Sequence, residues 1–366
     1  MALARWRKLD FKPKNPEIHG ASLFSVLGNR GYVKVKSSNR GKSRQAEGMS
    51  PKNLTIIGPG ALGILFATRI WQVFPHVSLL HHDGVKAQRM ATGGVAVLEE
   101  EGTVLRAFPR VSANAREIGR QDVIIVLVKA FQTEQILPDL EALCTPDTLV
   151  VTLQNGIGTG DILAKVAPAE NLVLGVTMHG ANKKDETTVV HAGEGETILG
   201  MFERDAPPSK KLKGLADLLE KGGFAISLVE DIYPVLWKKL MVNVGINPLT
   251  VLSGLRNGQI LEHPELAAIQ EMAVLEAFNV MKAHGIDIGM NFKEVLGLVR
   301  KVCRDTSRNV SSMLQDRINR RQTEIEFING AVVRLAHEAG LDAPVNESLY
   351  CWVRFFTRRG WDFGTC

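Results

Sequence analysis

The sequence predicts an α/β protein in which a doubly wound sheet of buried strands is followed by an all-helical domain. Three observations predict this fold. Short, nearly continuous aliphatic segments alternate with apolar-rich helical segments, which is typical of parallel strands covered on both faces. A glycine-rich turn joins the first of these strands to the first helix. After about residue 230 the strand pattern stops, and only helical periodicity continues.

Composition places the chain among soluble globular proteins. Its 366 residues are enough for two domains with sizeable cores, and 45% of them are hydrophobic and 23% charged. No apolar run approaches the roughly 18 residues of a membrane span, so we expect no contact with a membrane. The four cysteines have neither CxxC nor metal-ligand spacing, which indicates packing thiols in a reducing compartment and no metal site.

The first fifty residues differ from the rest in charge. They hold eleven Lys and Arg residues but only three acidic residues, a net charge of +8 that leaves −3 for the remainder. Because residues 1–50 are basic and acid-poor, they fit an organellar transit peptide, with delivery to a mitochondrial matrix or plastid stroma. The alternative is a disordered extension before a start at Met49, in a cytoplasmic protein. The mildly acidic body gives no reason to expect nucleic-acid binding.

The first strand of the sheet is expected at residues 53–57, and it runs directly into a glycine-rich turn. This is the GxGxxG pattern in the strand–turn–helix context that dinucleotide binding requires. Gly58 permits the tight turn, Gly60 lets the backbone approach a pyrophosphate, and Gly63 lets the helix pack close to the strand. We therefore expect a Rossmann-like domain with a nicotinamide or related dinucleotide cofactor. The expected cofactor-binding residues are Gly58, Pro59, Gly60, Ala61, Leu62 and Gly63.

The second strand is expected at residues 76–80, and its carboxyl end points to the adenosine ribose in such folds. An acid there binds the ribose of NAD, whereas a base binds the 2′-phosphate of NADP. Asp83 therefore favours NAD, while His82, Lys86 and Arg89 offer positive charge for a phosphate. Equally, Asp83 and Gly84 can form no more than a turn and a helix cap.

Polar side chains follow two further buried strands. Lys129 comes directly after residues 122–128, and Asn155 comes shortly after residues 148–153. Ligands of doubly wound sheets bind beyond the carboxyl ends of the strands, so both residues are candidate ligands. The alternatives are a surface lysine that opens a helix and an Asn-Gly turn. The remaining strands are expected at 95–99, 103–109, 172–179, 188–191, 197–199 and 224–229, with a helix at 207–221.

These patterns divide the chain into four segments. They are a basic extension at 1–50, a Rossmann-type dinucleotide-binding domain at 52–230, a helical substrate domain at 231–358 and a tail at 359–366. The helices of the second domain are expected at 232–246, 263–284, 292–304, 311–320, 323–340 and 344–357.

The first of these helices carries a polar stripe. Lys239, Asn243 and Asn247 recur every four residues, so each side chain is turned only about 40° from the one before it. A cation and two carboxamides on an otherwise apolar helix are costly to bury unless a ligand pairs with them. A small substrate with carboxylate, carbonyl and hydroxyl groups would supply that pairing. The alternative is that Lys239 reaches water and the two asparagines bond to neighbouring backbone.

Five motifs together resemble the ketopantoate reductase family, and the resemblance covers about residues 53–357. They are the glycine turn at 58–63, Val-Lys-Ala-Phe-Gln-Thr at 128–133, Leu-Gln-Asn-Gly at 153–156, and the segments 237–250 and 311–330. The resemblance implies a Rossmann domain and a helical domain with the active site between them. It also implies an NADP-dependent oxidoreductase that converts 2-dehydropantoate to (R)-pantoate, on the path to pantothenate and coenzyme A.

The resemblance also implies roles for individual residues. Lys239 is implied as the general acid, and Glu324 as an acid on the cofactor side of the site. The implied substrate ligands are Asn155, Asn243, Asn247, Asn257, Asn309 and Ser312. The implied cofactor ligands, besides the glycine turn, are His82, Lys129, Asn155, Ala181 and Glu324. Many members of the family have an arginine where this chain has His82, so we expect NADPH without excluding NADH.

Physical chemistry supports the role implied for the lysine. Negative charge grows on the keto oxygen as hydride arrives at the neighbouring carbon, and a nearby ammonium both stabilises that charge and supplies the proton. Burial on an apolar helix should lower the pKa of Lys239. Lys238 is the rival, but it lies about 100° away from the stripe. For Glu324 the alternative is simple first-turn charge in a helix that Thr323 and Glu326 would cap.

We therefore expect a reductase of a small 2-oxo acid, specifically of 2-dehydropantoate. Two alternatives remain open: a related enzyme that acts on another branched 2-oxo acid, and a non-catalytic dinucleotide sensor. The expected partner is the small-molecule substrate, with a homodimer left open.

Overall fold

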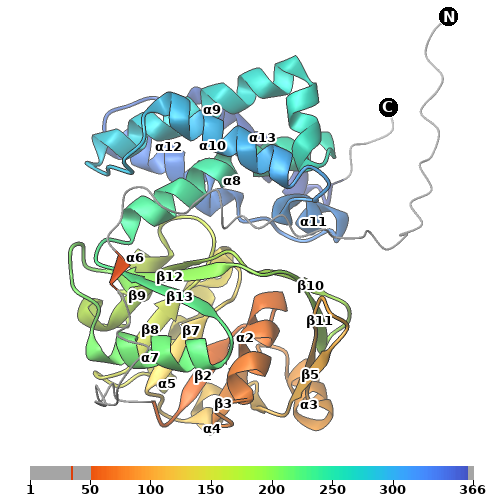
Figure 1. The fold of residues 1–366 in the computed structure, drawn as a ribbon, viewed down its shortest axis with the longest axis vertical. Helices are drawn as coiled ribbons and strands as arrows, with labels where there is room; N and C mark the ends of the chain where they lie inside the picture. Colours follow the sequence, from red (N-terminus) through yellow and green to blue (C-terminus); the bar gives the residue numbers. More distant parts are fainter. Residues whose placement is uncertain (1–33, 36–50, 362–366) are drawn as a thin grey trace, which may run out of the picture.

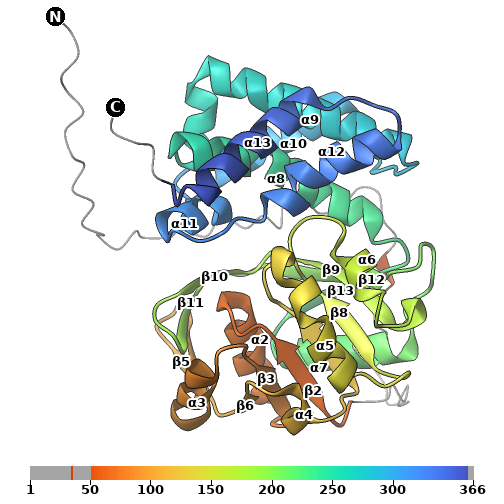
Figure 2. The same cartoon turned by 180° about the vertical axis from the view of Figure 1, so that it is seen from behind.

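The computed structural model describes residues 34–35 and 51–361 of the chain. They form an α/β domain that extends from β2 to β13 and a helical domain that extends from α8 to α13, one stacked on the other (Figure 1). The view from behind shows the same two layers, with α8 next to the α/β domain (Figure 2). The other residues of the extension and of the tail lie outside the described part, and so does the transit-peptide prediction. The predicted fold class is confirmed.

A nine-stranded sheet forms the centre of the α/β domain, in the order β1-β13-β12-β9-β8-β7-β2-β3-β6. The six strands from β6 to β9 in this order run parallel, β9 pairs antiparallel with β12, and β12 pairs parallel with β13. Within the extension, the short β1 pairs antiparallel with β13. The strands are β1 Lys34–Val35, β2 Leu54–Ile57, β3 Val77–Leu80, β6 Arg110–Ser112, β7 Val123–Val126, β8 Leu149–Thr152, β9 Leu172–Thr177, β12 Glu196–Met201 and β13 Ala225–Val229.

A second, four-stranded sheet lies beside the first, in the order β10-β11-β4-β5. Its strands are β10 Gly180–Lys183, β11 Thr188–Gly193, β4 Val95–Leu98 and β5 Val104–Ala107. The β10–β11 hairpin follows β9 directly, so it carries the chain from the carboxyl end of a central strand out to this smaller sheet.

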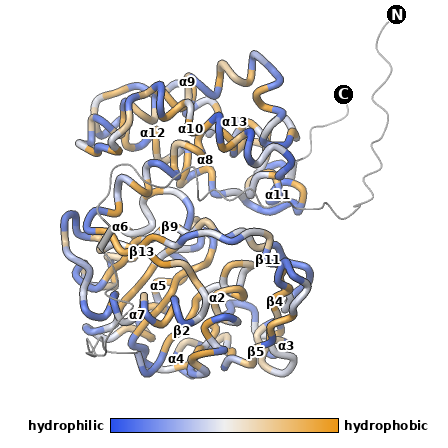
Figure 3. Tube along the Cα trace, viewed as in Figure 1, coloured by the Kyte–Doolittle hydropathy of each residue, from blue (hydrophilic) through white to orange (hydrophobic). Residues whose placement is uncertain are grey.

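Helices cover both faces of the large sheet because its strands are apolar on both sides. In β7, Val123 and Ile125 pack with residues of α2 and α7, whereas Ile124 and Val126 pack with residues of α4 and α5. Figure 3 shows hydrophobic residues along these central strands. The helices are α2 Ala61–Trp71, α3 Gly84–Gly93, α4 Ala115–Ile118, α5 Leu137–Leu143, α6 Thr159–Leu163 and α7 Lys210–Lys221, with short 3-10 turns η1 Ala130–Gln132, η2 Glu134–Ile136 and η3 Ala169–Asn171.

The helical domain is built around α8, which packs against α9, α10, α11 and α13. Close packing requires Gly245, since a Cβ there would lie 2.8 Å from Val299 and 3.0 Å from Val274. No helix in the described ranges is long and apolar enough to cross a membrane. The elements are α8 Tyr233–Ser253, η4 Asn257–Glu262, α9 Pro264–Ala283, α10 Phe292–Asp305, α11 Ser312–Ile318, η5 Ile325–Phe327, α12 Asn329–Glu338 and α13 Pro344–Arg358.

Two helix predictions need correction. Helix α8 continues past the predicted end at residue 246 through Pro248 and stops only at Gly254, which adopts φ +78°. Proline removes one helical N–H, and the Thr250 hydroxyl adds local bonds by donating to the carbonyl oxygens of Ile246 and Asn247, both at 3.0 Å.

The predicted single helix at 323–340 is wrong at its start. The helix α12 begins only at Asn329, and a short η5 turn precedes it. The Thr323 hydroxyl is buried without a hydrogen-bond partner in the described part of the chain, so the capping-box alternative is wrong as well. Hydrogen bonds from the α/β domain to Glu324 explain the break, because they hold this residue outside a regular helix.

Candidate active site

The glycine turn is shaped by close backbone contacts. Gly58 has φ +94°, and a Cβ there would lie 2.6 Å from the backbone nitrogen of Val128. A Cβ at Gly63 would lie 2.2 Å from the carbonyl oxygen of Gly58, so α2 can approach β2 only without a side chain at this position. These two glycines therefore fix the turn itself.

Gly60 differs, because the space beside it is open. A Cβ there would meet no atom closer than 4.0 Å, so nothing in the protein itself requires a glycine. Gly60 is the N-cap of α2, whose first turn contains no acidic residue and whose N-terminus receives no side-chain cap. Free N–H groups at a helix start with room for close approach suit a phosphate. The turn therefore fits a dinucleotide pyrophosphate.

At the end of β3, the acidic residue Asp83 does not have the position of a ribose-binding acid. Asp83 caps α3 by accepting hydrogen bonds from the N–H groups of Val85 and Lys86, at 3.0 and 3.1 Å. The helix-cap alternative for Asp83 is thus confirmed. His82 is exposed, and its ring lies 4.8 Å from the ring of His81.

A contact between the two domains forms around Glu324. Its carboxylate accepts a hydrogen bond from the N–H of Ala130 at 3.0 Å and another from the side chain of Asn155 at 3.2 Å. The ammonium of Lys129 lies 3.5 Å from the same carboxylate and 2.8 Å from Asp316. The carboxyl ends of β7 and β8 are therefore tied to the segment between α11 and α12.

Charge balance in this contact favours a protonated lysine. Burial alone would lower the pKa of Lys129, but the carboxylates of Glu324 and Asp316 outweigh it and raise that pKa. Burial also raises the pKa of Asp316 in spite of the neighbouring ammonium. Lys129 thus acts as a fixed positive charge at the domain boundary.

Lys239 extends from α8 to the end of β9. Its amine donates a hydrogen bond to the carbonyl oxygen of Thr177 at 3.0 Å. The amine is densely surrounded by protein, and this burial lowers its pKa to about 8 although the Glu324 carboxylate acts in the opposite direction. Near pH 7 such a group is protonated but gives up its proton readily, as a general acid should.

The two asparagines of the stripe stand on the same face of α8. Asn247 is buried and Asn243 is half-buried, and neither side chain has a hydrogen-bond partner among the described residues. Their unpaired donor and acceptor groups are therefore available to a ligand. The rival Lys238 has the smaller exposed area of the two lysines, and burial lowers its pKa as well.

The other residues implied as ligands lie in different parts of the structure. Asn257 donates from its side chain to the Thr306 hydroxyl at 2.9 Å, while its buried carbonyl oxygen lacks a partner in the described chain. Asn309 and Ser312 are exposed at the surface around α11. Ala181 lies in β10, where it pairs with His191.

Sequence reasoning missed two members of this site. The Thr177 carbonyl carries no residue-type signal, because any residue at the end of β9 offers the same oxygen. Asp316 carried a signal in its spacing, since it lies four residues after Ser312 on the expected helix, where i and i+4 share a face.

A dinucleotide-type glycine turn on a doubly wound sheet, combined with a half-buried lysine of lowered pKa on the adjoining helical domain, defines the class of two-domain nicotinamide-dependent oxidoreductases. Within this class the chain belongs to the ketopantoate reductase family. The family profile described as "Ketopantoate reductase PanE/ApbA" matches residues 54–204, and the profile described as "Ketopantoate reductase PanE/ApbA C terminal" matches residues 231–356.

Individual relatives agree with the family. The 2-dehydropantoate 2-reductase of Halobacterium salinarum is 32% identical over 307 residues, which cover 84% of this chain and 99% of the relative. The enzyme of the same name from Archaeoglobus fulgidus is 38% identical over 233 residues, 64% of this chain and 76% of the relative.

Solved structures show the same fold. A PanE/ApbA family ketopantoate reductase from Ralstonia eutropha superposes with a TM-score of 0.77 at 22% identity, over 85% of this chain and all of that one. A D-mandelate dehydrogenase, in a ternary structure with NADH and anilino(oxo)acetate, gives 0.76 at 27% identity over the same shares.

Proposed function

We propose that this protein is a 2-dehydropantoate 2-reductase, which reduces ketopantoate to (R)-pantoate at the expense of NADPH. The observation that carries the proposal is the polar stripe of α8, where the half-buried Lys239, whose amine has a lowered pKa, precedes two carboxamides without partners among the described residues. The names of the curated relatives support the substrate.

Each residue has a role that follows from its surroundings. When bound, the reduced nicotinamide supplies the hydride. Lys239 turns from the Thr177 carbonyl to the keto oxygen of the substrate, stabilises the charge that grows there and transfers a proton to it. Asn243 and Asn247 orient the substrate without adding a charge that would compete with the lysine. Glu324 holds the two domains together beside this point.

Preference for NADPH is supported by a group of basic residues at the end of β3. Burial, together with the neighbouring His82, Lys183 and Lys86, lowers the pKa of His81 to about 4. Burial and the charges of Arg321 and Lys86 similarly lower the pKa of Lys183. The cations Lys86, Lys183 and Arg321 thus lie near the end of β3, and this positive charge supports a 2′-phosphate in spite of the missing arginine at position 82.

The proposal is tested by measuring steady-state kinetics with ketopantoate and either NADPH or NADH. We expect a higher kcat/KM with NADPH. The Lys183→Ala variant should raise the KM for NADPH about tenfold, as the loss of one charged hydrogen bond implies, and should leave the KM for NADH unchanged. If neither cofactor is oxidised in a ketopantoate-dependent manner, the proposed function is wrong.

A second candidate is reduction of another 2-oxo acid, which the likeness to D-mandelate dehydrogenase favours. The same assay with a series of branched and aromatic 2-oxo acids separates the two candidates. A higher kcat/KM for phenylglyoxylate than for ketopantoate would select the second.

We also propose that the protein forms a homodimer through an apolar surface on α9 and α13. These neighbouring helices expose Met272, Leu275, Trp352 and Phe355, of which Trp352 is 56% exposed. A solved relative from Staphylococcus aureus is described as dimeric. Light scattering should give twice the chain mass, and Trp352→Asp should give the monomer mass. A parent protein that is monomeric at assay concentration would refute the dimer.

A further inference from the structure

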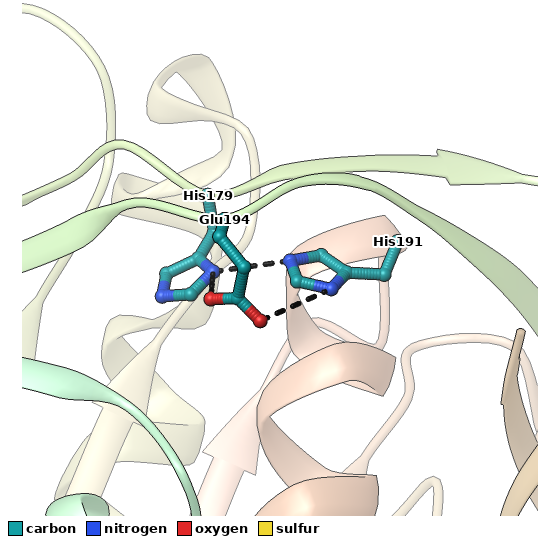
Figure 4. A group of neighbouring side chains, drawn as sticks. All are labelled: His179, His191 and Glu194. Carbon is teal, nitrogen blue, oxygen red and sulfur yellow. Dashed lines mark hydrogen bonds and ion pairs between the residues drawn. The ribbon is translucent and has the colours of Figure 1, made fainter. Parts of the chain in front are cut away.

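Away from the polar stripe of α8, the fold gathers a cluster of metal-ligand types that the sequence did not suggest. His179 lies just after β9, His191 lies in β11, and Glu194 follows the end of that strand (Figure 4). The two histidines are twelve residues apart, but the β10–β11 hairpin returns the chain to the same place. Both histidines are buried, with exposed fractions of 6% and 4%.

Two of the spacings between the donor atoms are close to those that a small metal ion requires. The Nδ1 atom of His179 lies 3.1 Å from Nε2 of His191 and 3.5 Å from a carboxylate oxygen of Glu194. One ligand atom from each residue can be chosen so that all lie within 4.8 Å of one another. Zinc–ligand bonds of about 2.0–2.1 Å in a tetrahedron separate neighbouring ligand atoms by roughly 3.3 Å. Two of the three spacings are close to this value, and the donor atoms of His191 and Glu194 have to approach each other for an ion to bind.

The groups around the cluster suit such an ion. Nδ1 of His191, which points away from His179, lies 2.7 Å from Glu99, as in the carboxylate–histidine pairs that orient metal ligands. Arg69 contacts the other oxygen of Glu194 at 2.7 Å, which leaves one oxygen of that carboxylate free to coordinate. Nε2 of His179 is buried and has no hydrogen-bond partner among the described residues.

The net charge of the cluster and its access to solvent also suit a metal ion. Arg69 is the only cation in contact with the cluster within the described ranges, and it forms a two-pronged salt bridge with Glu99, both bonds at 3.0 Å. The carboxylates of Glu99 and Glu194 exceed it by one negative charge. A cavity of about 510 Å³ opens onto His191 and Glu194, and the Glu194 side chain is 61% exposed. An ion can therefore enter, and a water molecule from the cavity can complete its coordination.

We propose that His179, His191 and Glu194 bind one divalent transition-metal ion of the zinc type. Without the ion, a shared proton lies between the two imidazoles. The ion replaces this proton when it binds. It then joins the end of β9 to β11, and so links the large sheet to the small one at the strand that carries Thr177. The proposal is independent of the substrate and cofactor of the enzyme.

The test uses the untagged full chain, treated with a chelator and then titrated with Zn²⁺ in a calorimeter and with Co²⁺ in a visible-light spectrometer. We expect one ion per chain, a visible Co²⁺ spectrum of tetrahedral type and a Tm that rises with Zn²⁺ concentration. Glu194→Gln should weaken binding at least tenfold and should fold normally, because its side chain is largely exposed. His191→Gln should abolish the Co²⁺ spectrum.

The matched control is Glu101→Gln, which changes an exposed carboxylate of the same cavity that is not a ligand, and it should bind the ion as the parent does. If the parent binds no Zn²⁺, the cluster is neutralised by Arg69 without an ion, and the proposal is overturned. The proposal is equally overturned if Glu194→Gln binds as tightly as the parent, since the ion would then lie elsewhere.

Discussion

Replacing Lys239 with alanine should reduce kcat for ketopantoate reduction about 10²–10⁴-fold, the range that general acid catalysis contributes. The variant should fold, because the lysine makes a single hydrogen bond to a backbone carbonyl, at 3.0 Å. Cofactor binding should change little, since the proton donor is needed only in the chemical step. Stopped-flow and steady-state kinetics, with thermal unfolding as the check of folding, measure these effects.

The matched control is Lys238→Gln, which removes the neighbouring amine on a different face of α8. This variant should retain a kcat near that of the parent once its folding has been verified. Near-normal turnover in Lys239→Ala, or an equal loss in both variants, would show that the proton comes from another source.

The pH dependence follows from the same group. The amine of Lys239 has a pKa of about 8, and only its protonated form can donate. Reduction should therefore be fastest below that pH, and kcat/KM should fall about tenfold per pH unit above it. The pH profile of the free enzyme measures this pKa directly.

Glu324→Ala should reduce kcat/KM about 10–100-fold. The change removes an acceptor for the Ala130 N–H and the Asn155 side chain and a partner for Lys129. A hydrogen bond to a charged group contributes about 1.5–3 kcal/mol, so one such bond realised in the transition state accounts for this range. Glu326→Ala is the matched control, because Glu326 belongs to the same turn but bonds to Tyr350 on an exposed side.

Glu324→Gln separates charge from geometry. The amide still has an oxygen for the Ala130 N–H, but the negative charge that raises the pKa of Lys239 is lost. The descending limb of the kcat/KM profile should consequently move below pH 8. An unchanged profile would show that Glu324 acts on the site through its hydrogen bonds alone.

The sequence predicted the architecture well because local patterns determine it. Residues 122–128 and 148–153 are aliphatic on both faces, and they became central strands with helices on either side. The stripe of α8 could be predicted for the same reason, since a spacing of four residues is a property of one helix. The start of the helix predicted at 323 failed, because hydrogen bonds from another domain decide where Glu324 lies.

Contacts between distant segments could not be predicted in this way. Asp316 meets Lys129 across 187 residues of sequence, and His191 in the β10–β11 hairpin meets Arg69 of α2 and Glu99. Neither pairing has a spacing that a single element would produce. Asn309 and Ser312 were inferred from motif matching alone, and their exposure in the structure leaves their roles as predictions.

The backbone oxygen at the end of β9 also limits how this enzyme can be altered by substitution. A side-chain carboxylate opposite the amine would raise the pKa of the ammonium. The resulting ion pair would also have to break before each turnover. A peptide carbonyl orients the amine while leaving its charge unneutralised, and no change of residue type at position 177 removes it. The acidity of the proton donor must therefore be tuned from elsewhere, through burial and through the single distant charge at position 324.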